Sequence, residues 1–96
     1  MTKEQLNKAL NSKLMTDDFP QVKKVAVNKI AKDEDRIYTD FNIDVVVSEY
    51  DLESYSDIST RIYEIIDMLI YEKKMYFEIL IYGEDGKYIT SRRRVK

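Results

Sequence analysis

The side chains that most often perform catalysis near neutral pH are missing from this chain of 96 residues, which contains neither histidine nor cysteine. Imidazole bases, thiol nucleophiles, disulfides and Cys/His zinc sites are therefore excluded. Serine and threonine are numerous, but none has a lysine or carboxylate base at a recognisable spacing. We therefore predict a protein that is not an enzyme and that uses no cofactor and no metal.

Two carboxylates have the opening ligand spacing of a calcium loop. Asp40, Asn42 and Asp44 stand at alternate positions, but Val45 occupies the place where an EF-hand loop needs glycine. In an extended strand, Asp40 and Asp44 would lie about 13 Å apart at about 3.3 Å per residue, which exceeds the separation of a glycosidase acid pair. Neither calcium binding nor glycoside hydrolysis is expected here.

A second fragment with possible chemistry is Asp85-Gly86-Lys87. It has the D-x-K spacing found in some metal-dependent nucleases, with Glu78 as a nearby second acid. A tight turn explains the same residues without a metal, because glycine adopts a positive φ at little cost. We favour the turn.

Acidic residues are concentrated in the middle of the chain, where residues 33–57 hold nine acids and one arginine. Such a stripe could bind a basic partner, and it makes a small inhibitor of a host enzyme or nucleic-acid-binding protein an alternative function. A solvated strand and ordinary acids at a helix start explain it more simply. The stripe comprises Asp33, Glu34, Asp35, Asp40 and Asp44.

Basic residues end the chain as Arg92, Arg93, Arg94 and Lys96. Arginine is suited to bidentate contacts with phosphate oxygens, so these four residues are possible phosphate contacts and make nucleic-acid binding a further alternative. A short solubilising tail is the simpler interpretation. We assign residues 92–96 to a basic C-terminal tail and residues 1–91 to a single domain.

Apolar periodicity predicts the elements that must position these residues. Alternation typical of strands is clearest around Phe41, Ile43 and Val45, whereas Ile58, Ile62 and Ile65 recur at helical spacing. Thr2 and Gln5 have the spacing of a capping box, and Asp51, Ser54 or Ser56 could cap the second helix. The predicted elements are a helix from Lys3 to Met15, strands at 22–30 and from Arg36, a helix closed by Lys73 and Lys74, and strands from Met75 to Tyr82 and Lys87 to Ser91.

This order, α-β-β-α-β-β, predicts an α+β two-layer sandwich with a mostly antiparallel sheet and both helices on one face. The other face should be polar, yet tyrosines and aliphatic residues fall on it. Tyrosine is common at protein interfaces, although cross-strand pairing within one chain would also explain its use here. The residues predicted for this uncovered face are Tyr38, Val46, Tyr76, Leu80 and Tyr82.

The layout resembles that of small tail-terminator or tail-completion proteins of long-tailed bacteriophages. The resembling stretches are Asp18-Phe19-Pro20-Gln21-Val22 and Phe41 through Leu69. This resemblance implies a non-catalytic protein that forms rings or docks onto tail or connector subunits. Ring-building modules of secretion and sporulation machines have a similar layout and remain an alternative.

Together these features predict an assembly or interaction protein that works through the uncovered sheet face. We expect a protein partner and a homo-oligomer, either a dimer or a ring, because a chain of this size buries only a modest core. No stretch approaches the roughly 20 apolar residues of a membrane-spanning helix, and a cytoplasmic location is expected.

Overall fold

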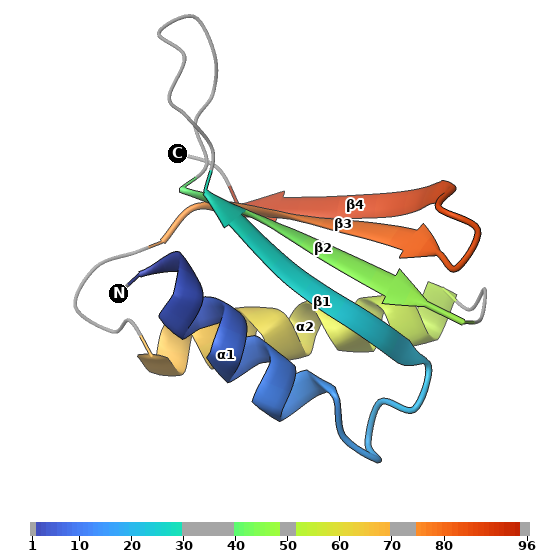
Figure 1. The fold of residues 1–96 in the computed structure, drawn as a ribbon, viewed down its shortest axis with the longest axis horizontal. Coiled ribbons are helices and arrows are strands. Elements are labelled where there is room, and N and C mark those ends of the chain that lie inside the picture. Colours follow the sequence, from blue (N-terminus) through green and yellow to red (C-terminus); the bar gives the residue numbers. More distant parts are fainter. Residues whose placement is uncertain (1, 30–39, 49–51, 70–74, 95–96) are drawn as a thin grey trace, which may run out of the picture.

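The computed structural model describes residues 2–29, 40–48, 52–69 and 75–94 (Figure 1). Within these ranges the elements follow the order α-β-β-α-β-β, which confirms the predicted order and the α+β class. The elements are α1 (Lys3–Leu14), β1 (Val22–Lys29), β2 (Phe41–Val47), α2 (Leu52–Leu69), β3 (Phe77–Gly83) and β4 (Tyr88–Arg94). None of these helices is long and apolar enough to cross a membrane.

The strands form one mixed sheet in the order β1-β2-β3-β4. β1 pairs with β2, and β3 with β4, in antiparallel fashion, whereas β2 and β3 are parallel and are connected through α2. The sheet is thus mostly antiparallel, as predicted. Figure 1 shows both helices on the same side of the sheet. The opposite side is called the open face below.

The core lies between the helices and the sheet. In β2 and β3 the odd-numbered side chains are buried and those between them are only half-buried, as the alternation predicts. Leucines of α1 and isoleucines of α2 recur every three or four residues and complete the core. Its largest fully buried side chains are Phe77, Leu6, Leu10, Leu14, Ile43, Ile58, Ile62, Ile65, Ile66, Ile79, Ile81 and Val45.

Several element boundaries differ from the predicted ones. The capping box of Thr2 and Gln5 is present at the start of α1, but the helix ends at Leu14 and Met15 is its C-cap. Ser54 and Ser56 lie inside α2 and therefore cannot cap it. Asp51, Lys73 and Lys74 lie outside the described residues, as do the predicted first hairpin turn and the strand residues before Asp40.

The fourth strand is longer than predicted. Arg92, Arg93 and Arg94, which we assigned to a tail, belong to β4 and pair with residues of β3. Their side chains are not apolar, so no alternation marks them as a strand. β4 continues through the arginines because β3 runs antiparallel beside it, and the backbone of β3 down to its first residue, Phe77, is available for pairing with Arg94.

The outer edge of β1 is partly covered by α1. The Val27 N–H donates a hydrogen bond to Asn7 Oδ1 (3.1 Å), and the Val25 carbonyl accepts one from Asn11 Nδ2 (3.0 Å). A free strand edge is a template for pairing with another chain, and proteins often protect it. The two asparagines occupy backbone groups that an added strand would need.

We expect Asn7→Ala to lower the free energy of unfolding by about 1–3 kcal/mol, because the part-buried Val27 N–H then loses its acceptor. Ser12→Ala, at an exposed position of the same helix, is the control for helix propensity. Urea unfolding of the two variants measures the difference. Equal stability would show that the contact between Asn7 and β1 contributes nothing.

Candidate functional site

The strand register arranges the open face in rows that cross the sheet. One row is apolar at its centre, with Val46 beside Tyr82 and Tyr82 beside Tyr88. The next row places Asp44 beside Leu80. A third row is polar and consists of Asn28, Asn42, Glu78 and Arg93.

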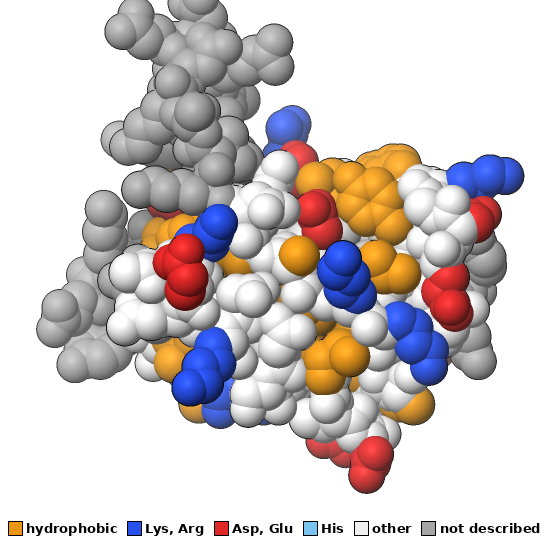
Figure 2. Space-filling view, in the orientation of Figure 1, with side chains coloured by type: hydrophobic (Ala, Val, Ile, Leu, Met, Phe, Trp, Pro, Cys, Tyr) orange, Lys and Arg blue, Asp and Glu red, His pale blue; other side chains and the backbone are white. Residues whose placement is uncertain are grey.

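Val46, Leu80, Tyr82 and Tyr88 form an apolar area that we call the tyrosine patch. The first three are half-buried, and Tyr88 is 57% exposed. The rings of Tyr82 and Tyr88 meet edge to face with centroids 6.1 Å apart, and the Tyr88 hydroxyl lies 2.9 Å from Ser91 Oγ. In Figure 2, apolar side chains gather on the upper surface of the molecule, over the sheet. The patch offers two fixed aromatic rings to solvent.

Tyr88 is a member of the patch that sequence reasoning missed. Strict alternation would place it on the same side as Thr90, which faces the helices with Ile81. The register shifts between Ile81 and Tyr82, so that Tyr88 pairs with Tyr82 instead. The sequence does show one relevant signal. Tyr88 comes shortly after the predicted turn and Tyr82 shortly before it, so the two aromatic residues could have been expected to pair across the hairpin.

Tyr76 does not join the patch, because it precedes β3 and Glu78 lies between it and Leu80 in the sequence. The backbone of Tyr76 is tied to Asp40: the Asp40 N–H donates to the Tyr76 carbonyl (2.7 Å), and the Tyr76 N–H donates to Asp40 Oδ2 (3.1 Å). Tyr38 lies outside the described residues. The predicted set is thus divided, with Val46, Leu80 and Tyr82 brought together and Tyr76 set apart.

The acidic stripe is engaged within the chain where the structure describes it. Asp40 extends the pairing of β2 with β3 as above, and Asp44 Oδ2 accepts a hydrogen bond from Asn28 Nδ2 (3.1 Å). Burial raises the pKa of the Asp44 carboxyl, while the Asn28 hydrogen bond and the charge of Lys24 oppose that shift. The remaining members Asp33, Glu34 and Asp35 lie outside the described residues.

We expect Asp44→Asn to stabilise the protein increasingly as the pH rises from about 3.9, the ordinary aspartate pKa. The raised pKa means that the folded state binds the Asp44 proton more tightly than the unfolded state does, so wild-type stability falls through that window. Asparagine has no such titration, and its Oδ1 can keep the hydrogen bond from Asn28. Urea unfolding between pH 3 and 7 measures the difference, and a difference that shrinks with rising pH would contradict this expectation.

The three adjacent arginines do not converge on one site. Arg93 lies on the open face, 59% exposed and 3.9 Å from Glu78. Arg94 faces the helices, where Nε donates to the Met75 carbonyl (2.8 Å) and Nη1 lies 2.9 Å from Asp67 Oδ1. Arg92 also faces the helices, and its guanidinium lies 5.1 Å from the centroid of the Tyr63 ring. Lys96, the fourth residue of the predicted phosphate contact, lies outside the described residues.

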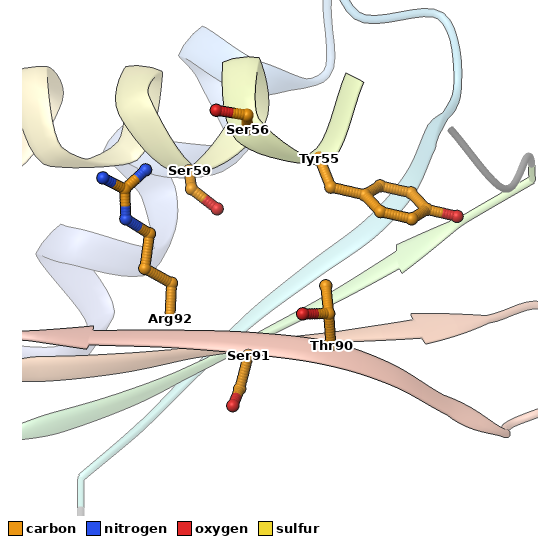
Figure 3. Close-up of a pocket in the computed structure, with 6 residues that line it drawn as sticks. All are labelled: Tyr55, Ser56, Ser59, Thr90, Ser91 and Arg92. Atoms are coloured by element: carbon orange, nitrogen blue, oxygen red, sulfur yellow. The ribbon is translucent and has the colours of Figure 1, made fainter. Parts of the chain in front are cut away.

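A hollow of about 220 Å³ lies between the first half of α2 and β4. Figure 3 shows Thr90 and Arg92 directed toward α2, whereas Ser91 points to the opposite side of β4. Because β4 is the last strand of the sheet, the hollow lies beside this edge. Its residues come from two distant segments, so periodicity alone could not find it. The lining residues are Tyr55, Ser56, Ser59, Thr90, Ser91 and Arg92.

The D-x-K fragment forms the turn between β3 and β4. Gly86 has a φ of 83°, and the Lys87 N–H donates to Asp85 Oδ1 (3.0 Å). Glu78 lies near the other end of β3, so the structure does not bring it to Asp85. Within the described part of the chain, no group of three or more acidic side chains is placed to hold a metal ion.

Comparison with known proteins gives no match, whether with protein-family models, with curated proteins or with solved structures.

Proposed function

We propose that the protein is a non-enzymatic interaction and assembly protein, and that the tyrosine patch on its open face binds another polypeptide. A second copy of the chain is the first candidate for that polypeptide. The main support is the pair of tyrosine rings, Tyr82 and Tyr88, held against each other on the side of the sheet that faces away from both helices.

The physical basis is the size and rigidity of these rings. An aromatic side chain can bury about 150–250 Å², and tyrosine is enriched among the residues that dominate interface energies. The contact between the two rings and the hydrogen bond from Tyr88 to Ser91 limit the entropy lost on binding. The polar row with Glu78 and Arg93 borders the patch, as polar residues border the apolar centre of many interfaces.

The alternatives have less support. An inhibitor acting through the acidic stripe would need free carboxylates, whereas Asp40 and Asp44 already accept hydrogen bonds within the chain. A phosphate site would need convergent arginines, whereas Arg93 lies on one side of β4 and Arg94 on the other. The resemblance in layout to phage tail proteins supports a structural role in a ring or on other subunits.

The experiment replaces three residues of the patch together: Leu80→Ser, Tyr82→Ser and Tyr88→Ser. We expect this variant to keep its helix content by circular dichroism and to lose association, measured as molar mass by sedimentation and as affinity for a co-purified partner. The loss of even one hot-spot residue, at about 2 kcal/mol, corresponds to a dissociation constant raised by about 30-fold.

The matched control is the double variant Met15→Ser, Met68→Ser. Both methionines are exposed, at 45% and 66%; Met15 is the C-cap of α1 and Met68 lies in α2, so neither belongs to the strands that form the open face. We expect this control to associate like the wild type. A folded patch variant whose mass and partner affinity equal those of the wild type would contradict the proposed function.

A further inference from the structure

The two edges of the sheet differ in how they are protected. At the β1 edge, Asn7 and Asn11 of α1 bond to the strand backbone. At the β4 edge, no strand of the described residues pairs with the outer side of β4. The outward backbone groups of β4 are therefore a place where an extended segment could add to the sheet.

The charge of this edge is basic on both of its sides. Arg92 is exposed on the helix side, and among the described residues no carboxylate forms an ion pair with it. Arg93 is 59% exposed on the open side, with Glu78 only at the limit of ion-pair distance. Side chains of an added strand would alternate between the two sides of the sheet. Those on the helix side would lie near Arg92, and those on the open face would lie near Arg93.

The hollow beside β4 gives one of these arginines a site for a carboxylate. Arg92 rises from β4 toward α2, and Thr90 and Ser59 bring hydroxyl groups to the same space (Figure 3). Because the hollow is open to solvent and lined by residues of the edge strand, a side chain of an added strand can enter it. Arginine and hydroxyl donors together favour a carboxylate in that position.

We propose that the outer edge of β4 binds an extended acidic segment of a partner protein, which pairs with the β4 backbone and places a carboxylate in the hollow beside Arg92. A second copy of β4 fits poorly, because it would bring three more arginines to the same edge. This inference goes beyond the proposed function, because it concerns the edge of β4 rather than the tyrosine patch and names an acidic segment as the occupant.

The probe is a displayed library of short random peptides, selected on the full chain. We expect the selected peptides to be rich in glutamate or aspartate and in β-branched residues. For the best of them, fluorescence anisotropy should show at least about tenfold weaker binding to Arg92→Glu, Arg93→Glu, and a similar loss when alternate peptide amides are N-methylated. A peptide with lysine in place of its acids should bind that variant more tightly than it binds the wild type.

The control variant Lys8→Glu, Lys13→Glu makes the same charge change at exposed positions of α1 and should leave binding unchanged. Selected peptides without acidic residues, binding that survives the arginine reversal, or tighter binding of an oligothymidine than of any peptide would overturn the inference. The patch variant separates the two proposals. If the patch variant loses association but no peptide binds at β4, the proposed function stands and this inference fails. If peptides bind at β4 but the patch variant associates like the wild type, this inference stands and the proposed function fails.

Discussion

Phe77→Ala should lower the free energy of unfolding by about 3–5 kcal/mol, the largest single effect we expect. Phe77 is fully buried at the start of β3, between β2 and β4. Its ring meets the Tyr63 ring edge to face at 4.9 Å, and the Arg94 guanidinium lies 4.9 Å from its centroid. Truncation removes these contacts and leaves a cavity that the flanking strands cannot fill.

Urea unfolding at constant pH measures this effect. Phe77→Leu is the matched variant, because leucine retains most of the apolar volume and should cost distinctly less. A domain of this size has a total stability of about 5–15 kcal/mol, so Phe77→Ala could leave little folded protein at equilibrium. A loss below about 1 kcal/mol would show that Phe77 does not occupy the packed core.

Arg94→Ala should lower the free energy of unfolding by about 2 kcal/mol, although Arg94 belongs to a run of three arginines. Its side chain is only 16% exposed and joins β4 to the Met75 carbonyl and to Asp67 of α2. Loss of the guanidinium leaves that carbonyl without its donor. The Nη2 atom of Arg94 is buried and has no hydrogen-bond partner among the described residues. Its desolvation reduces the net stability that the guanidinium contributes, which is why the expected cost of Arg94→Ala is not larger.

Arg93→Ala is the control for Arg94→Ala, since the neighbouring side chain is 59% exposed and its contact with Glu78 is long. An exposed pair of this kind contributes at most about 1 kcal/mol. Thermal or urea unfolding of both variants compares the two positions. Equal destabilisation would contradict the assignment of Arg94 to a structural role and of Arg93 to the exposed surface.

Local patterns were sufficient to predict most of the fold. Alternation around Ile43 assigns β2 and its buried side, and the spacing of Ile58, Ile62 and Ile65 assigns the inner side of α2. The Thr2 capping box predicts where α1 begins. Each of these features depends on residues close together in the chain, which is why the sequence alone shows them.

Features that depend on distant contacts could not be predicted in this way. The parallel pairing of β2 with β3 is set by how α2 packs, which no local pattern encodes. The arginine end of β4 forms a strand because β3 is beside it. Asn7 and Asn11 have the appearance of ordinary helix residues until β1 is placed next to them.

The candidate surface was predicted in part for the same reason. Val46, Leu80 and Tyr82 share the open face because strand side chains alternate. Tyr88 reaches the same face only through the register shift at Ile81, and that shift is visible only once β3 and β4 are paired. The hollow beside Arg92 likewise requires α2 and β4 to be adjacent.

Photo-crosslinking from position 88 tests most directly whether the open face contacts another polypeptide. A benzophenone amino acid replaces Tyr88 of the tyrosine patch in one variant and Met68 of α2 in a second, two side chains of similar exposure at 57% and 66%. We expect irradiation to link position 88, and not position 68, to one defined polypeptide, either a second copy or a single partner identified by mass spectrometry. Equal or absent crosslinking at the two positions would contradict binding through the tyrosine patch.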